Sequence, residues 1–223
     1  MKLIIERWRR HTLDEGTGRL AAKTGLHIYC DMDGVLVDFV AGVMPILNAD
    51  VRDMSIPSIK PSGGLTPIGK LRKVMEEKGI KEILPAHISK GEDKMRHAIN
   101  YMSKRIGDDF DWWANLPWMP GGKELWDFIA PHNPTILTTP MGPNSEAGKI
   151  AWCGKHLGFT EDKIEMAPNP PGKSGWAAGD KILIDDFYET NIEPWDAAGG
   201  IGIHHTDTKR TIQSLKEFGF IKK

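Results

Sequence analysis

The chain has 223 residues, of which 40% are hydrophobic and 26% are charged, a composition typical of a globular protein. Its formal net charge of −1 argues against a general attraction to nucleic acid or membranes, and no apolar run approaches the ~20 residues that a membrane-spanning helix needs. The opening residues contain only "LII" as an apolar core, too short for a secretory signal. The two cysteines, Cys30 and Cys153, suggest a reducing compartment. We therefore expect a cytoplasmic protein without a membrane partner.

The first elements in the chain are a helix, a strand and a second helix. Residues 1–24 are expected to form an N-terminal extension that begins with a short amphipathic helix, "LIIERWRRHTL". A strand is predicted over 26–30, where "LHIYC" is largely apolar. The stretch "LVDFVAGVMPILN" then has a helical pattern. Pro45 is expected to disturb this helix, because proline lacks the N–H that a helix interior needs.

Residues 44–116 are predicted to form a small helical cap. The stretch "SIPSIKPSGG" is rich in proline, glycine and serine and is typical of a loop. Helices are predicted over 66–79, which opens with Thr66 before Pro67, and over 91–106, which opens with two acids. Apolar residues recur at helical spacing in both helices, and no convincing strand pattern occurs in this part of the chain.

The remainder of the chain alternates strands with helices. Strands are predicted over 134–140, 163–168, 180–186 and 200–205, and helices over 145–158, 191–199 and 208–219. This alternation predicts βαβ units and a parallel sheet. We therefore expect an α/β fold whose core domain comprises residues 25–43 and 117–223, with the helical cap inserted into it.

Three polar residues stand at the carboxyl ends of predicted strands: Asp31, Thr138 and Asp185. In a parallel sheet the carboxyl ends of the strands lie at one edge, and ligands bind there. The coincidence predicts a single site at this edge, built from residues that are far apart in the sequence.

The first of these strand ends carries a group of acids. In "DMDGVLVDF", Asp31 and Asp33 are separated by one residue, Gly34 follows, and Asp38 closes the group. Carboxylates this close repel one another, and burial raises the cost further, so a divalent cation is the simplest partner. Gly34 permits a tight turn that lets Asp31 and Asp33 face one cleft. The alternative is a cluster that binds a calcium-like ion or caps a helix.

A second pair of acids follows a later strand. In "ILIDD", Asp185 and Asp186 follow an apolar run, and two acids in that position cannot both stay buried without a partner. A cation is again the natural partner, and oxygen-only ligands favour Mg²⁺ over zinc. The pattern does not distinguish which of the two carboxylates binds the cation directly.

These motifs resemble the haloacid dehalogenase-like (HAD) superfamily, whose first motif is DxDG after a strand, and the resemblance covers nearly the whole chain after the N-terminal extension. It implies a Rossmann-like parallel sheet flanked by helices, with a cap after the first motif. It also implies that Asp31 is a nucleophile that forms an aspartyl-phosphate and that Asp33 is the general acid/base. Mg²⁺ would be held by Asp31, by the Asp33 carbonyl and by one or both of Asp185 and Asp186.

The resemblance also implies contacts to the phosphate. "ILTTP" matches the second motif, so Thr138 would donate a hydrogen bond to a phosphoryl oxygen and Thr139 would be a further contact. The third motif requires a lysine beside the nucleophile and the phosphate. Lys173 is favoured, because the loop before the acidic strand opens on the same cleft. Lys149, on the helix after the threonine strand, is the alternative or a further phosphate contact.

The stretch "PPGKSG" could also be the end of a nucleotide-binding P-loop. That motif has a glycine five residues before its second glycine, where this chain has Ala167. Pro170 and Pro171 also lack the N–H groups that would bind a phosphate. A nucleotide-driven kinase is therefore disfavoured.

Within the superfamily, Asp33 favours a phosphatase or phosphomutase, since a dehalogenase has no leaving oxygen to protonate. The stretches "DMDGVLVDF", "WWANLPWMPGGKEL", "ILTTP", "GKIAWCGKHLG" and "GDKILIDD" resemble 5′(3′)-deoxyribonucleotidases, in the same order. The tail "NIEPWDAAGGIGIHH" resembles the bacterial and phage-encoded members of that family. The resemblance implies a small phosphate ester as substrate, a (deoxy)nucleoside monophosphate. Phe39, Trp112 and Trp113 would hold its base, and stacking on an aromatic face contributes ~1–3 kcal/mol. Asn191 would shape the edge of the cleft.

Other functions would share the catalytic residues. A phosphatase of sugar phosphates or of nucleic-acid ends would differ in its cap, although the cap's basic residues are interleaved with acids, which disfavours a nucleic-acid groove. A non-catalytic phosphate-binding module is disfavoured by the complete set of acids, threonine and lysine. The sequence does not predict an oligomeric state.

Overall fold

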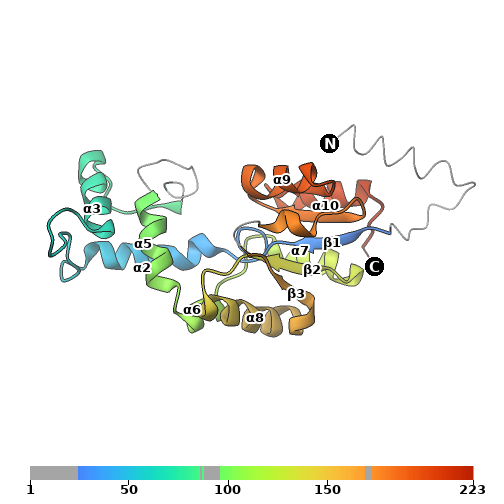
Figure 1. Cartoon of the computed structure of the whole chain (residues 1–223), viewed down its shortest axis with the longest axis horizontal. Helices are drawn as coiled ribbons and strands as arrows, with labels where there is room; N and C mark the ends of the chain where they lie inside the picture. The colour runs from blue at the N-terminus through green and yellow to red at the C-terminus, as the bar shows by residue number, and fades with distance from the viewer. Residues whose placement is uncertain (1–24, 86, 88–95, 169–171, 223) are drawn as a thin grey trace, which may run out of the picture. The chain divides into compact units, whose positions relative to one another are not determined.

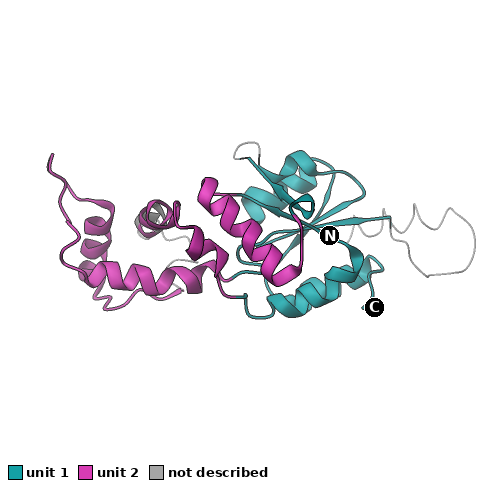
Figure 2. Cartoon of the chain, turned by 90° about the horizontal axis from the view of Figure 1, so that it is seen from below, with its two compact units in different colours: residues 1–37, 118–139, 161–223 teal, residues 38–117, 140–160 magenta. Residues whose placement is uncertain are grey.

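The computed structural model describes residues 25–85, 87, 96–168 and 172–222, and its helices and strands are labelled in Figure 1. The chain forms two compact units, which are coloured separately in Figure 2. Unit 1 comprises residues 1–37, 118–139 and 161–223, and unit 2 comprises residues 38–117 and 140–160. The N-terminal extension expected over 1–24 lies outside the described residues, as do the first residues of the helix predicted from residue 91.

Unit 1 is built on a sheet of five parallel strands. The strands are β1 (His27–Cys30), β2 (Thr135–Thr138), β3 (Ile164–Met166), β4 (Lys181–Asp185) and β5 (Ile201–His204). Their order is β3-β2-β1-β4-β5, and each neighbouring pair is parallel. The predicted α/β fold with a Rossmann-like parallel sheet is therefore confirmed, with β1 at the centre.

The sheet is stable because apolar side chains on both of its faces are covered. On one face, Tyr29 of β1 and Leu183 of β4 pack with Trp195 in a buried cluster. Side chains alternate along a strand, so Ile28 and Ile182 point to the opposite face, and both are buried. Helices of unit 1 lie on both sides of the sheet in Figure 2, as a parallel sheet requires.

Short helices precede, connect and follow the strands of unit 1. They are α7 (Gly122–Ile129), α9 (Glu193–Ala197) and α10 (Thr208–Glu217), with the 3₁₀ turns η2 (Ala130–His132), η3 (Glu161–Lys163) and η4 (Lys173–Trp176) and the π-helical turn η5 (Tyr188–Ile192). α10 begins after Asp207, whose side chain accepts a hydrogen bond from the Arg210 N–H. The sequence did not predict α7. This helix begins after Gly121 with no capping side chain, so the usual start signal is missing.

Unit 2 is helical. Its helices are α2 (Phe39–Arg52), α3 (Pro67–Lys78), α5 (Arg96–Ile106), α6 (Phe110–Ala114) and α8 (Pro143–Leu157). The prediction of α3 is confirmed at both ends: the Thr66 side chain accepts a hydrogen bond from the Gly69 N–H, and Gly79 ends the helix with a φ of 65°. As expected, the described residues of unit 2 contain no strand. No described helix of either unit combines the length and apolar composition needed to cross a bilayer.

α2 runs through Pro45 and ends at Arg52, although the sequence predicted a disturbance at this proline. Tertiary contacts hold the second half of the helix. The buried Asn48 donates a hydrogen bond to the Ile83 carbonyl at 3.0 Å and accepts one from the Ile83 N–H at 2.9 Å. Arg72 donates to carbonyl oxygens in and just after the last turn of α2. These contacts offset the hydrogen bond that a proline removes from a helix.

α8 packs against α6 and belongs to unit 2, although it follows β2 in the chain. Gly148 allows the close approach, because a Cβ at this position would overlap the Cβ of Trp113. The Trp152 indole N–H also donates to the Leu116 carbonyl at 2.9 Å. Unit 2 therefore contains residues 140–160, which the expected cap of 44–116 did not include. The division into a core and a cap that act as separate domains stays a prediction.

Gly148→Ala is predicted to destabilise the protein by ~1–3 kcal/mol, because the added methyl group overlaps Trp113 and packed helices must separate. Gly154→Ala in the same helix is the matched control. Its Cβ would meet only the Phe159 carbonyl at 3.7 Å, and alanine should raise helix stability by up to about 1 kcal/mol. Urea denaturation followed by tryptophan fluorescence measures both variants. Equal free energies of unfolding would contradict the close α6–α8 contact.

Candidate active site

The carboxyl ends of β1 and β4 bring two of the predicted acids together. Cys30 pairs with Ile184 in the parallel register, and the Asp31 N–H donates to the Ile184 carbonyl at 2.9 Å. Asp31 therefore lies beside Asp185, the last residue of β4. Thr138 ends β2, which is the neighbour of β1 on its other side. All three residues therefore lie at the carboxyl ends of their strands, as the sequence predicted, and the strand order makes these strands neighbours.

Lys173 lies between the two acids. Only 3% of this residue is exposed, and its Nζ lies 2.6 Å from Asp31 Oδ1 and 2.6 Å from Asp185 Oδ2. Burial by itself would lower the pKa of Lys173, but the two neighbouring carboxylates outweigh burial and raise it. The ammonium therefore stays charged, and it offsets negative charge that could not otherwise be buried.

Asp186 adds a third carboxylate to this pair. One oxygen from each of Asp31, Asp185 and Asp186 lies within 4.8 Å of the others. Burial raises the pKa of Asp186 to about 8, and the charges of Asp31 and Asp185 act in the same direction. Lys173 offsets one of the three negative charges, so a divalent cation would neutralise the fully ionised cluster.

Asp185 and Asp186 differ in their hydrogen bonds. Asp185 accepts from Lys173, from the Phe187 N–H at 2.9 Å and from the Asn191 amide at 2.9 and 3.0 Å. Asp186 Oδ1 is buried and has no hydrogen-bond partner within the described part of the chain. Such an atom in a native structure calls for an explanation. An orphaned carboxylate oxygen in a cluster of oxygen ligands fits Mg²⁺, which prefers such ligands.

The turn after β1 depends on Gly34. Its φ of 76° lies in the left-handed region, and its N–H donates to the Val37 carbonyl at 2.9 Å. A Cβ at this position would also overlap the Asp186 carboxylate. Glycine thus serves the tight turn, as the sequence predicted, and also the approach of the β4 end. Asp33 lies in the same turn and is partly buried. We expect its backbone carbonyl oxygen, rather than its carboxylate, to bind the metal, and this expectation stays a prediction.

The other predicted phosphate contacts belong to both units. In unit 1, Thr138 is buried, and Thr139 after it is partly exposed. Lys149 lies on α8 in unit 2, where it is buried with its Nζ 5.0 Å from the centre of the Trp113 ring. Lys173 thus contacts Asp31 within one unit, whereas Lys149 belongs to the other unit.

The three predicted aromatic residues form one cluster in unit 2. The ring centres lie 5.5 Å apart for Phe39 and Trp112, 5.8 Å for Phe39 and Trp113, and 4.9 Å for Trp112 and Trp113. Trp113 is 0% exposed, and its indole N–H donates to the Ile106 carbonyl at 2.9 Å. Phe39 and Trp112 are partly exposed. Phe39 and Trp112 are thus the members of this cluster that retain solvent exposure, whereas Trp113 is fully buried in unit 2.

Two further residues make hydrogen bonds that the sequence did not specify. Asp38, which closes the group of acids after β1, accepts a hydrogen bond from the Ala41 N–H at 2.8 Å and caps α2. Asn191 was expected only to shape the edge of a cleft, yet its amide contacts both oxygens of Asp185. No local signal in the sequence marks this contact, because the two residues are connected by a π-helical turn, and such turns are rare.

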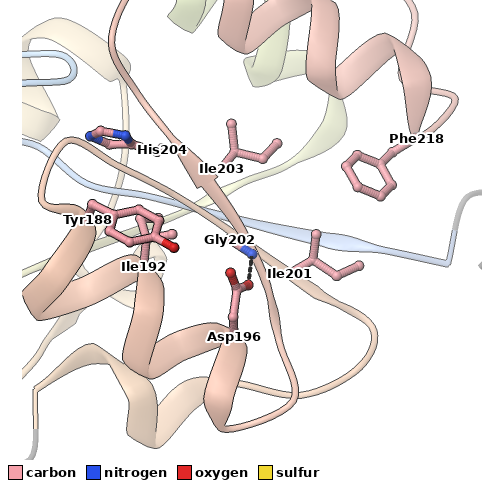
Figure 3. A pocket seen from close by; sticks show the side chains of 8 residues that line it. All are labelled: Tyr188, Ile192, Asp196, Ile201, Gly202, Ile203, His204 and Phe218. Carbon is pink, nitrogen blue, oxygen red and sulfur yellow. Dashed lines mark hydrogen bonds between the residues drawn. The ribbon is translucent and has the colours of Figure 1, made fainter. Parts of the chain in front are cut away.

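A separate cavity of about 110 Å³ lies beside β5 in unit 1. Figure 3 shows it lined by residues of β5, η5 and α9 and by Phe218 after α10, with Asp196 accepting a hydrogen bond from the Gly202 N–H at 2.6 Å. Lys173 and the three clustered acids do not line it. The acidic cluster, and not this cavity, is therefore the candidate active site.

Sequence comparisons identify no related protein: neither a protein-family model nor a curated protein matches the chain. Several solved structures are similar. A haloacid dehalogenase-like family hydrolase from Streptococcus pneumoniae has 15% identity and a TM-score of 0.47, covering 87% of this chain and 99% of that one. A predicted phosphoglycolate phosphatase from Haemophilus somnus has 17% identity and a TM-score of 0.43, covering 83% and 87%.

A putative HAD-hydrolase from Bacillus subtilis, solved with bound magnesium, has 12% identity and a TM-score of 0.43, covering 79% of this chain and 85% of that one. At such identities and TM-scores the similarity concerns the course of the chain alone. The chemistry of the site must therefore be argued from its own residues.

Gly34→Ala is predicted to destabilise the protein more than Gly199→Ala. Both glycines lie in unit 1 and have a positive φ, which costs an alanine ~1–2 kcal/mol. A Cβ at Gly199 would meet nothing within 4 Å, whereas one at Gly34 would overlap Asp186. Urea denaturation measures the difference. If the two variants lose equal stability, the close approach of Asp186 to the turn is wrong.

Proposed function

We propose that this chain is a Mg²⁺-dependent phosphomonoester hydrolase of the HAD superfamily that acts through an aspartyl-phosphate. The observation that carries the proposal is the buried carboxylate of Asp31. It lies at the carboxyl end of the central strand, is bound by Lys173 at 2.6 Å, and belongs to a cluster of three acids. A carboxylate held in this way is suited to nucleophilic attack, because its orientation is fixed before the substrate arrives.

Asp31 and Asp33 divide the chemistry between them. A carboxylate oxygen of Asp31 attacks phosphorus as the bond to the ester oxygen breaks, and Asp33 protonates that leaving oxygen. The aspartyl-phosphate on Asp31 is then hydrolysed. Asp33, now ionised, takes a proton from water, the water oxygen attacks phosphorus, and the bond to Asp31 breaks to release phosphate. Such acid/base help contributes roughly 10²–10⁴-fold to the rate.

Lys173 and Thr138 stabilise the charge that moves during these steps. The Lys173 ammonium contacts Asp31 directly and would balance negative charge on the phosphoryl oxygens as they develop it. Thr138 would donate a hydrogen bond to one of these oxygens, and Thr139 and Lys149 would provide further contacts. The short distance from Lys173 to Asp31 supports Lys173, rather than Lys149, as the lysine of the third motif.

Asp31, Asp186 and the Asp33 carbonyl would hold Mg²⁺. The two acids at the end of β4 are assigned by their surroundings. Asp185 is already bound by Lys173, Asn191 and the Phe187 N–H, whereas Asp186 Oδ1 lacks a hydrogen-bond partner among the described residues. Bound Mg²⁺ would supply positive charge that allows the anionic nucleophile and the anionic phosphate to approach each other.

The substrate that we propose is a (deoxy)nucleoside monophosphate, hydrolysed as by a 5′(3′)-deoxyribonucleotidase. The support is the sequence resemblance together with the partly exposed rings of Phe39 and Trp112, since an aromatic face can stack on a base. Trp113 would act indirectly by supporting Trp112. The proposal places the protein in the cytoplasm, in keeping with its two buried cysteine thiols.

Hydrolysis of p-nitrophenyl phosphate, measured against Mg²⁺ concentration, tests the proposed reaction. The wild-type protein should require Mg²⁺. Asp31→Asn keeps the size of the side chain but removes the attacking charge, so turnover should fall to near background. A variant that keeps more than a tenth of wild-type activity would reject Asp31 as the nucleophile.

The same titration distinguishes the roles of Asp185 and Asp186. Asp186→Asn should raise the Mg²⁺ concentration for half-maximal activity by at least ~10-fold. Asp185→Asn should instead lower kcat, because Asp185 orients Lys173. Asp196→Asn is the control: it lies outside the acidic cluster, and asparagine can still accept from Gly202, so activity should not change. Identical Mg²⁺ curves for all three variants would contradict the metal assignment.

Trp112→Ala is predicted to weaken hydrolysis of nucleotides selectively. Loss of one stacking partner costs ~1–3 kcal/mol, or roughly 5–150-fold in kcat/KM for a nucleoside monophosphate. A small ester such as p-nitrophenyl phosphate should change much less. Phe110→Ala, on the same helix and 42% exposed, is the control for loss of an aromatic side chain. A panel of 5′- and 3′-mononucleotides beside sugar phosphates gives the measurement, and equal losses on all esters would reject the nucleotidase assignment but not the phosphatase.

A further inference from the structure

The chain leaves β4 through the π-helical turn η5. The Ile192 N–H donates to the Phe187 carbonyl at 3.1 Å, five residues back, and the Asn191 N–H donates to the same carbonyl at 3.2 Å. π-helical turns are rare and occur frequently at functional sites. Ile192 is 1% exposed and packs with Leu183 and Trp195 in the buried cluster under the sheet. The turn is thus anchored at its end, directly after Asn191.

Asn191 binds the Asp185 carboxylate from this turn. Its Nδ2 lies 2.9 Å from Oδ1 and 3.0 Å from Oδ2 of Asp185. Both oxygens of an ionised carboxylate are acceptors, so only the NH₂ end of the amide can make this contact. Asp185 is 0% exposed. Water does not reach this carboxylate, so hydrogen bonds from protein groups must stabilise its negative charge.

Two ion pairs of Lys173 connect Asp185, and through it Asn191, to the proposed nucleophile Asp31. Asp185 Oδ2 lies 2.6 Å from Lys173 Nζ, and the same Nζ lies 2.6 Å from Asp31 Oδ1. The Phe187 N–H fixes Asp185 Oδ1 at 2.9 Å. Loss of Asn191 would leave Asp185 with a donor on each oxygen but without the group that bridges them, so the carboxylate could rotate and carry Lys173 with it.

We propose that Asn191 is a positioning residue: it holds Asp185 in the orientation that places Lys173 against Asp31. The inference rests on the function proposed above and adds a residue that acts only through Asp185 and Lys173. It also explains why a neutral amide suits this position. An aspartate there would have nearly the same shape, but it would lack the N–H donors and would place a fourth carboxylate beside the acidic cluster.

Two substitutions distinguish positioning from packing. Asn191→Leu removes the donors without adding charge, and Asn191→Asp keeps the shape but replaces the donors with a negative charge. Thr190→Ala, in the same turn and exposed, is the control. The kcat, the KM for p-nitrophenyl phosphate and the half-saturating Mg²⁺ concentration are measured for each, with circular dichroism melting curves to establish the folded fraction at the assay temperature.

For Asn191→Leu, kcat should fall roughly 10–100-fold, the size typical of residues that orient the groups of a site. KM and the half-saturating Mg²⁺ concentration should stay within about 2-fold of wild type, because the inference gives Asn191 no contact with the substrate or with Mg²⁺. Asn191→Asp should lose more activity than Asn191→Leu, and Thr190→Ala should match wild type. In a Lys173→Met background, Asn191→Leu should cost less than about 2-fold, since its effect passes through Lys173.

The opposite ranking, with Asn191→Asp close to wild type and Asn191→Leu impaired, would show a packing role and overturn the inference. A lowered melting temperature with normal kcat for the folded fraction would overturn it as well. So would a shift in half-saturating Mg²⁺ with normal kcat at saturation, because it would assign Asn191 to the metal. If the wild-type protein itself hydrolyses no phosphate ester with Mg²⁺, the proposed function fails; if it does and the Asn191 variants match it, this inference alone fails.

Discussion

The burial of like charges at one edge of the sheet is the constraint on which the site depends. One carboxylate oxygen from each of Asp31, Asp185 and Asp186 lies within 4.8 Å of the others, and Lys173 lies between Asp31 and Asp185. Three carboxylates so close and so well buried cannot all stay ionised with one ammonium as compensation. With all three acids ionised, the cluster carries two negative charges more than its one ammonium offsets, which a divalent cation would neutralise. The Mg²⁺ ion that we propose would offset the free energy that burial of these like charges costs by itself.

The surrounding structure keeps this cluster in place by several independent means. The parallel register sets Asp31 beside the end of β4, and Gly34 removes the Cβ that would overlap Asp186. The π-helical turn after β4 supplies Asn191 and the Phe187 N–H to Asp185. Each device acts on a different carboxylate. The result is three acids with three environments, which supports the different roles that we propose for these chemically identical side chains.

Most elements of the fold were predictable because their signals are local. The five strands are short apolar runs, and α3 has a capping threonine before it and a glycine after it. The exceptions depend on tertiary contacts. α7 lacks a capping side chain but buries an apolar face, and α2 continues past Pro45 because Asn48 and Arg72 fix its second half. α8 joins unit 2 because Gly148 permits close packing on Trp113, and no periodicity in α8 itself could reveal its partner.

The sequence by itself determined the residue types of the site and their placement at strand ends. Two acids after one apolar run, two after another and threonines after a third lie along one edge of the sheet if the sheet is parallel. The strand order then makes these three strand ends neighbours. Only the tertiary structure decided which groups contact one another. It placed Lys173 between Asp31 and Asp185, gave Asp185 and Asp186 different partners, turned Asp38 into a helix cap and brought Asn191 to the carboxylate. The physical reason is that the interactions in this cluster depend on distances of a few ångströms. These distances separate segments that are far apart in the sequence, and the order of residues does not fix them.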